Sequence, residues 1–138
     1  MEKIWRGWII DKSLKDKSTL SGFKVIKSQE EENNNGDEKQ IWVLYTVEIE
    51  EKNVEKVAKV LEKQIKLEYY AHFTNGKKLL VIFHNKSFLI NLEKYGKDEG
   101  NGITSFKAKL EDRKLWKLAF KYAVNNAKID PRYLLEVK

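Results

Sequence analysis

The two histidines are the first candidates for catalysis or metal binding in this 138-residue chain, because the sequence contains no cysteine. The absence of cysteine excludes thiolate nucleophiles, disulfide frameworks, Cys-based zinc sites and iron–sulfur clusters. His72 and His84 fall in neighbouring segments with strand character, and the predicted strand pairing turns them to opposite faces of one sheet. They therefore cannot share a metal ion, and we predict neither a metal site nor a cofactor.

Two other segments resemble ligand-binding loops without meeting their requirements. The acidic stretch 30–38 has a calcium-loop register that begins at Glu31, but its twelfth position is Trp42, where calcium needs a bidentate carboxylate. Gly96 and Lys97 lack both the earlier glycine and the following hydroxyl residue of a phosphate loop. Because no nucleophile can be placed beside a base, we favour a non-catalytic protein and leave an enzyme open.

Aromatic residues near a cation form the first candidate binding site. Arg6 lies between two tryptophans near the N-terminus, and Tyr70 and His72 share one face of a predicted strand. If a small ligand binds, we expect it where these two groups meet. The residues of this candidate ligand-binding site are Trp5, Arg6, Trp8, Tyr70 and His72.

The spacing of lysines makes nucleic-acid binding the alternative function. Four lysines recur every seven residues and a fifth lies nearby, which predicts a basic stripe on the C-terminal helix. Lysine stripes are also the ordinary outer faces of helices, and the sequence has only three arginines, the residue that base recognition favours. The net charge is +6, but residues 30–55 carry nine acidic and two basic residues and would repel phosphate. The stripe comprises Lys107, Lys114, Lys117, Lys121 and Lys128.

The elements that must position these residues follow from periodicity and turn signals. Alternating apolar residues predict a strand over 41–49, and apolar residues at helical spacing predict an amphipathic helix from Val54 to Ile65. Asn75-Gly76 predicts a hairpin turn in which Thr74 faces Lys77, and a second reversal is expected at Asn85-Lys86. Further predicted elements are strands at 4–10, 23–28 and 134–137, a short helix at 13–20, a mobile acidic loop at 30–38 and a helix at about 111–127.

This order of elements predicts an α+β fold in a single domain covering residues 1–138. We expect an antiparallel sheet with the helices packed on one face. From residue 40 onward the order matches a ferredoxin-like βαββαβ core with extra N-terminal strands.

The predicted hairpins are apolar on both faces, which raises the question of what covers the second face. One face carries Leu67, Tyr69, Ala71, Phe73, Leu80, Ile82 and Leu89, and the other carries Tyr70, Leu79, Val81, Phe83, Phe88 and Ile90. We favour cover by the N-terminal segment with Trp5, Trp8 and Phe23. A symmetric homodimer and a ligand cleft are the alternatives.

Composition and motifs also bear on location and relatives. The chain has no signal-like apolar segment and no run of 18 apolar residues, so we expect a cytoplasmic protein that does not contact a membrane. Three short strings carry a resemblance to other proteins: Trp5-Arg6-Gly7-Trp8, Ser13-Leu14-Lys15-Asp16 and Tyr69-Tyr70-Ala71-His72-Phe73. With these strings the chain resembles a group of small uncharacterised prokaryotic proteins. The resemblance implies a compact prokaryotic domain with no known activity, and it transfers no site residues; a partner protein, a small ligand or nucleic acid all remain open.

Overall fold

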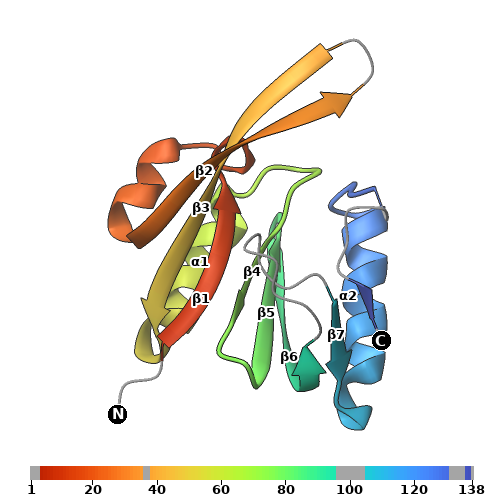
Figure 1. Cartoon of the computed structure of the whole chain (residues 1–138). Coiled ribbons are helices and arrows are strands. Elements are labelled where there is room, and N and C mark those ends of the chain that lie inside the picture. The colour runs from red at the N-terminus through yellow and green to blue at the C-terminus, as the bar shows by residue number, and fades with distance from the viewer. Residues whose placement is uncertain (1–3, 36–37, 96–104, 131–135, 138) are drawn as a thin grey trace.

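The computed structural model describes residues 4–35, 38–95, 105–130 and 136–137 (Figure 1). Its strands are β1 (Ile4–Ile10), β2 (Lys24–Asn35), β3 (Glu38–Glu50), β4 (Ala71–Thr74), β5 (Lys78–Phe83), β6 (Lys86–Tyr95), β7 (Ser105–Ala108) and β8 (Glu136–Val137). Its helices are α1 (Val54–Gln64) and α2 (Arg113–Asn125). Short 3₁₀ turns are η1 (Asp11–Ser13), η2 (Lys17–Gly22), η3 (Glu51–Asn53) and η4 (Leu110–Asp112).

The strands form one sheet in the order β2-β3-β1-β4-β5-β6-β7-β8. Neighbours from β2 to β7 pair antiparallel, and β8 pairs parallel with β7. The α+β class and the antiparallel sheet are therefore confirmed. The ferredoxin-like core stays a prediction, because only the order of elements along the chain supports it.

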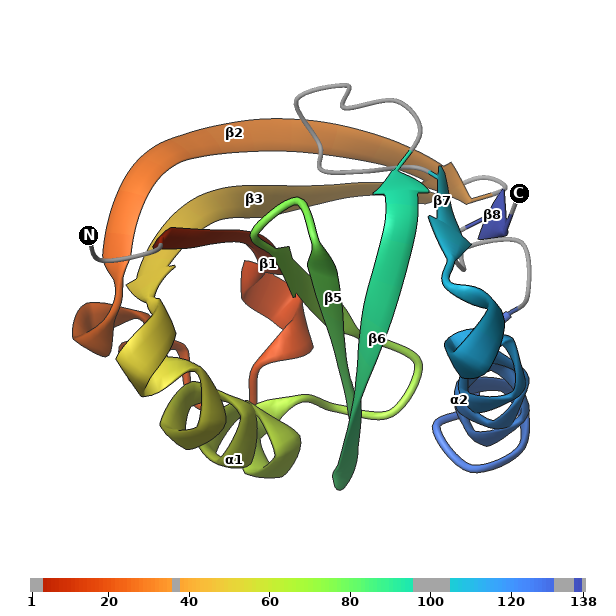
Figure 2. The ribbon, with the colours of Figure 1, turned by 90° about the horizontal axis from the view of Figure 1, so that it is seen from below.

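The two helices lie on opposite faces of the sheet, so the prediction that they pack on one face is wrong (Figure 2). The cause is β5, in which successive side chains alternate between faces and nearly all are apolar. Leu80 and Ile82 pack in the cluster that contains α1, whereas Leu79, Val81 and Phe83 pack in the cluster that contains α2. Each apolar face of the central strands therefore has its own helix.

The predicted cover by the N-terminal segment is also wrong. β1 joins the sheet as a strand between β3 and β4 instead of crossing its face. Trp5 and Phe23 belong to the α1 side, while α2 covers the second face over β5 and β6. The second face does carry a cover, as the apolar pattern predicts, but α2 supplies it. β1 instead satisfies its backbone N–H and C=O groups by pairing with β3 on one side and β4 on the other.

The hairpin at Asn75-Gly76 is confirmed, with a register two residues from the predicted one. Gly76 has a φ of 92°, and the Asn75 side-chain oxygen accepts hydrogen bonds from the backbone N–H groups of Lys77 and Lys78. Thr74 lies opposite Leu79 instead of Lys77. A shift by two residues leaves every side chain on its predicted face, which is why the assignment of the apolar faces survived the error.

The turn between β5 and β6 fastens both helices to the sheet. The backbone N–H of Asn85 donates to the carbonyl of Glu62 in α1 at 2.8 Å, and the hydroxyl of Tyr122 in α2 donates to the carbonyl of His84 at 2.7 Å. The ring Nδ1 of His84 lies 2.9 Å from the carbonyl oxygen of Ile65, just after α1. One two-residue turn thus ties together helices that lie on opposite faces.

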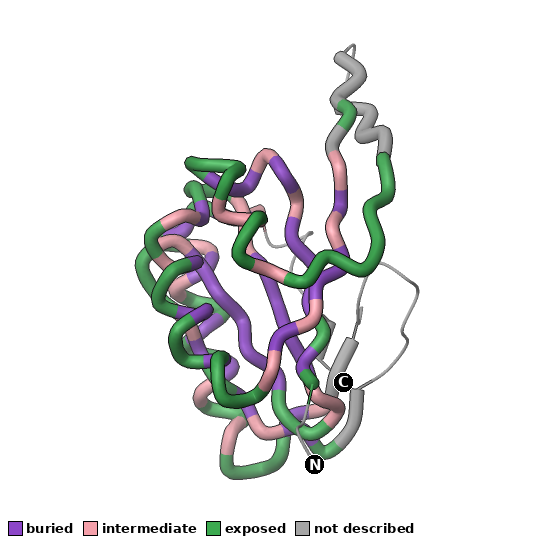
Figure 3. The backbone as a smooth tube through the Cα atoms, turned by 90° about the vertical axis from the view of Figure 1, so that its left-hand side faces the viewer, coloured by how far each residue is buried: buried purple, intermediate pink, exposed green. Residues whose placement is uncertain are grey.

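β2 and β3 continue as a two-stranded ribbon beyond the body of the sheet, where the sequence predicted an acidic loop (Figures 1 and 3). β1 pairs with β3 only as far as Ile10 opposite Leu44. We call residues 30–35 and 38–43, which lie past that point, the arm. Along the arm, β3 pairs with β2 and with no other described strand.

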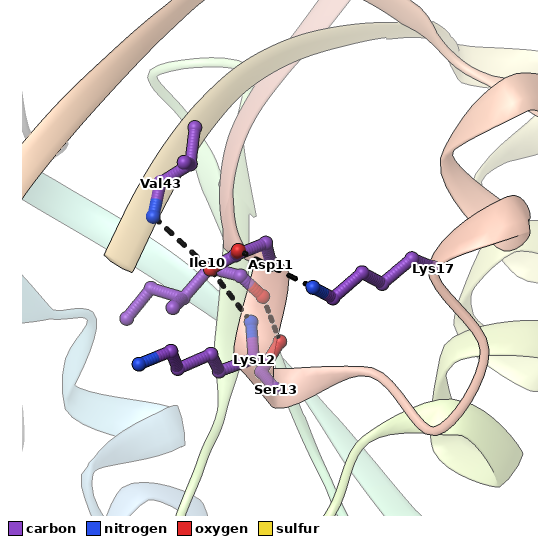
Figure 4. Close-up of polar contacts among 6 residues, drawn as sticks. All are labelled: Ile10, Asp11, Lys12, Ser13, Lys17 and Val43. Carbon is purple, nitrogen blue, oxygen red and sulfur yellow. Dashed lines mark hydrogen bonds and ion pairs between the residues drawn. The ribbon is translucent and has the colours of Figure 1, made fainter. Parts of the chain in front are cut away.

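Asp11 marks the point where the arm leaves the sheet (Figure 4). Its buried carboxylate accepts hydrogen bonds from the backbone N–H groups of Lys12 at 2.8 Å and Val43 at 3.0 Å. The ammonium of Lys17 lies 3.8 Å from the other carboxylate oxygen. Asp11 therefore replaces the strand partner that Val43 loses where β1 ends.

Gly7 is a position at which the sheet has no room for a larger side chain. It lies opposite Phe73 in the β1–β4 pairing, and a Cβ atom added at Gly7 would overlap the fully buried Phe73 ring. We expect Gly7→Ala to lower the free energy of unfolding by about 1–3 kcal/mol, because the ring must move in a packed core. Urea unfolding measures this difference.

Gly22→Ala is the matched control, since a Cβ atom there meets nothing within 4 Å. We expect this control to stay within about 0.5 kcal/mol of the wild type. Equal stability of the two variants would show that Phe73 does not confine Gly7.

Candidate functional site

The structure brings three of the five residues of the predicted ligand site together. Trp8 lies opposite His72 in the β1–β4 pairing, with ring centroids 5.3 Å apart, and the ring of Tyr70 lies 6.2 Å from that of His72. Trp5 faces the other side of the sheet in the α1 cluster, because residues of odd and even number on a strand point in opposite directions. Arg6 is exposed two residues before Trp8. The predicted site is therefore split between two faces.

The ring cluster of Trp8, His72 and Tyr70 is part of the interior. Trp8 is 5% exposed and His72 is 8% exposed. The ring centroid of Tyr70 lies 5.9 Å from that of Phe83, which packs in the cluster that contains α2. Burial lowers the pKa of His72 to about 4 and raises the pKa of Tyr70. His72 is therefore neutral at pH 7, and a ligand could reach its ring only by displacing the neighbouring side chains.

The predicted lysine stripe is shorter in the structure than in the sequence. Lys107 lies on β7, where its ammonium is 3.4 Å from the carboxylate of Glu93, and Lys128 follows the helix with its ammonium bonded to the carbonyl of Asn125. These two lysines therefore lie outside α2, which spans Arg113–Asn125, so the predicted stripe does not extend over all five residues. Three members remain on the exposed side of α2: Lys114, Lys117 and Lys121.

A groove on the α1 side is the site that the sequence did not predict. It has a volume of about 510 Å³ and lies between η2, α1 and the ends of β1, β2 and β3. Its lining residues are Ile4, Thr19, Gly22, Phe23, Lys24, Glu48, Ile49, Glu50, Asn53, Lys56, Val57 and Val60. We call this site the α1 groove.

Backbone hydrogen bonds position the η2 wall of the α1 groove. The N–H of Lys15 donates to the carbonyl of Gln64 at the end of α1, and the N–H of Lys66 donates to the carbonyl of Ser13, each at 2.8 Å. Asp16 then begins η2 by accepting hydrogen bonds from the backbone N–H and hydroxyl of Ser18, and the hydroxyl bond is the main cause of its lowered pKa. The 3₁₀ turn is thus held beside α1 by the chain segment before it.

The walls of the α1 groove are apolar at the bottom and charged at the rim. Ile49 and Val57 belong to the buried core, whereas Val60 is 40% exposed on the α1 wall. Lys24 lies opposite Glu48 in the β2–β3 pairing. Glu50 lies 3.0 Å from Lys52.

Lys56 is the second lysine in the lining of this groove. It is exposed on α1, and it has no ion pair with any residue that the structure describes. Lys24 likewise has no ion pair with a described residue, so the groove presents an apolar floor beside two lysines without ion pairs.

Only one sequence signal pointed to the α1 groove. Val60 is an apolar residue outside the apolar stripe of its helix, where the pattern predicts a charged or polar residue. The other lining residues come from segments far apart in the chain, and their approach depends on the tertiary fold.

Burial of His72 has a consequence for stability at low pH. The pKa is about 4 in the folded protein and 6.5 as the ordinary value, so the unfolded chain binds a proton that the folded protein excludes. Stability attributable to His72 is complete above pH 6.5 and falls as the pH drops from 6.5 towards 4, by about 3 kcal/mol in total. We expect His72→Phe to flatten this part of the pH profile.

Urea unfolding of both proteins at pH 7 and pH 4.5 tests the expectation. The Nε2 atom of His72 is buried without a hydrogen-bond partner, so His72→Phe should be at least as stable as the wild type at pH 7. Parallel pH profiles for the two proteins would show that His72 takes no part in the acid destabilisation.

Comparison with known proteins assigns this chain to no family. No family model, no curated protein and no solved structure matches it. Among the described residues, no group of three or more His, Asp and Glu side chains is arranged to hold a metal ion, and no described helix is long and apolar enough to cross a membrane. The case for a function therefore rests on the geometry of the α1 groove and of α2.

Proposed function

We propose that this protein is a non-catalytic binding module that takes a small amphipathic anion in the α1 groove. The observation that carries the proposal is an apolar floor beside two lining lysines, Lys24 and Lys56, neither of which has an ion pair with a described residue. The volume of about 510 Å³ falls within the range of ordinary small-molecule sites. A ligand with an apolar body and one acidic group would fit both features.

The chemistry of the lining supports binding over catalysis. The groove contains neither histidine, and its one hydroxyl side chain is Thr19. Its carboxylates, Glu48 and Glu50, each lie beside a lysine. A nucleophile next to a general base, which most covalent and acid–base mechanisms require, is not among these residues.

A dye pair tests the groove. 8-Anilinonaphthalene-1-sulfonate is an aromatic anion of suitable size, and N-phenyl-1-naphthylamine is its uncharged relative. We expect Val60→Trp to fill the groove and to reduce binding of both dyes at least about tenfold, because the larger side chain occupies the apolar volume. Leu67→Trp is the matched control, since Leu67 is similarly exposed and does not line the groove.

The variant Lys56→Glu tests the contribution of charge to binding separately from that of the apolar floor. We expect this variant to weaken binding of the sulfonate dye and to leave binding of the neutral dye unchanged. Dye fluorescence titrations at constant salt measure both affinities. Equal binding by wild type and Val60→Trp would refute a site in the α1 groove, and equal loss of both dyes in Lys56→Glu would refute the role of charge.

Nucleic-acid binding through α2 is the second candidate function. The observation that favours it is the charge of α2, which carries four basic residues and no acidic residue over 13 positions. Binding of this kind depends strongly on salt, because lysines displace counterions from phosphates.

A fluorescence anisotropy titration with labelled single strands and duplexes tests this candidate. We expect measurable affinity at low salt, a loss of affinity at moderate salt, and a weaker salt dependence in the variant K114E/K117E/K121E. Absence of salt-dependent binding to either form would eliminate nucleic acid as the partner.

We infer a cytoplasmic location and a prokaryotic origin as parts of the same proposal. The lack of cysteine suits a compartment in which disulfides do not form. The origin rests on the resemblance of the Trp5-Arg6-Gly7-Trp8 string and its companions.

A further inference from the structure

The two lysines that line the α1 groove differ in the carboxylates around them. Lys24 lies opposite Glu48 in the β2–β3 pairing, and the Cβ atoms of directly opposed residues are about 5 Å apart. Lys56 is on α1, where residues three and four positions away share one side of the helix. Those positions are occupied by Lys52, Asn53, Lys59 and Val60. Because none of these is acidic, Lys56 has no carboxylate on its own side of the helix.

Asn53 is a polar lining residue whose side chain the fold does not use. It directly precedes α1, where an asparagine side chain commonly accepts a hydrogen bond from the first turn of the helix. Because η3 runs straight into α1, Asn53 has helical dihedral angles (φ −101°, ψ −2°), and its side chain makes no such bond. It makes no other hydrogen bond with a described residue. The two N–H donors of its amide are therefore available one helical turn from Lys56.

The charges of the lining favour a singly charged acid group over a phosphate. Glu48 and Glu50 also line the groove, and a phosphate monoester, with about −1.5 to −2 charges at pH 7, would be repelled by them. No arginine, the residue that binds phosphate through two parallel hydrogen bonds, is among the lining residues. A carboxylate carries one charge, and its two oxygens can accept hydrogen bonds from the amide of Asn53 and the ammonium of Lys56.

The apolar part of the lining is aliphatic except for Phe23. Its aliphatic members are Ile4, Ile49, Val57 and Val60. These residues come from β1, β3 and α1, so the apolar surface is continued from one element to the next. A flexible alkyl chain can follow such a surface, and each methylene group that it buries adds to the affinity.

We propose, on the premise that the α1 groove binds an amphipathic anion, that this ligand is an aliphatic monocarboxylate such as a saturated fatty acid. Its carboxylate lies at Asn53 and Lys56, and its alkyl chain covers the aliphatic floor of the groove. Asn53 is then the residue that distinguishes a carboxylate from other polar head groups.

Displacement of the uncharged dye N-phenyl-1-naphthylamine tests the class of ligand. Decanoate, decyl phosphate and 1-decanol have alkyl chains of similar length and differ in the head group, and each is added below its micelle-forming concentration. We expect decanoate to bind at least about tenfold more tightly than the phosphate or the alcohol, because the lining suits a single carboxylate. Octanoate should bind more weakly than decanoate, because its shorter chain buries less apolar surface.

Asn53→Asp tests the position of the carboxylate. Aspartate has nearly the same size as asparagine and suits the residue before a helix equally well, but its charge repels a carboxylate. We expect this variant to weaken decanoate binding at least about tenfold and to leave decanol binding within about twofold of the wild type. Lys63→Gln is the matched control, because it changes the net charge equally at an exposed position of α1 outside the groove, and it should bind decanoate like the wild type.

Nuclear magnetic resonance provides a second readout that a purely structural role of Asn53 would not change. We expect the side-chain NH₂ resonances of Asn53 to shift when decanoate is added and to stay in place when decanol is added, because only the carboxylate accepts their hydrogen bonds strongly.

The possible failures can be told apart. If decanol or decyl phosphate displaces the dye as well as decanoate does, the ligand is not a carboxylate, although the α1 groove still binds the dye. Equal binding of decanoate by wild type and Asn53→Asp, with unshifted Asn53 resonances, would place the carboxylate elsewhere. If the wild type binds neither dye nor decanoate, the proposed function fails and the carboxylate site fails with it.

Discussion

The structure depends on a central strand that is apolar on both sides. Leu79, Val81 and Phe83 are completely buried on one face of β5, and Leu80 and Ile82 are buried on the other. Neither face can be left to water, since each would expose a large apolar patch. This constraint requires one helix on each face, and it explains why the turn after β5 is bonded to α1 and to α2.

The same constraint leaves the two ends of the sheet unequal. The helices cover the middle, where the apolar residues are concentrated, and the β2–β3 ribbon extends beyond this cover. Asp11 satisfies the Val43 N–H at the point where the ribbon loses β1, but it cannot support the residues further out. The surfaces available for binding therefore lie at the periphery of the packed centre: the α1 groove and the exposed side of α2.

The prediction of candidate site residues from the sequence was less accurate than the prediction of secondary-structure elements. It grouped Trp5 with Trp8, although three positions along a strand place two side chains on opposite faces, and β1 puts Trp5 against α1 and Trp8 against His72. It also extended the lysine stripe past both ends of α2. The α1 groove was missed because its walls come from six elements, and only Val60 departed from the local pattern.

The sequence by itself determined the α+β class, the amphipathic helices, the hairpin at Asn75-Gly76 and the faces of the central strands. These features depend on periodicity and turn geometry, which act over a few residues. Tertiary structure alone decided that β1 enters the sheet between β3 and β4, that the helices lie on opposite faces, and that the acidic segment forms strands. Those outcomes depend on which distant segments compete for the same apolar face or strand edge, and no local pattern contains that competition.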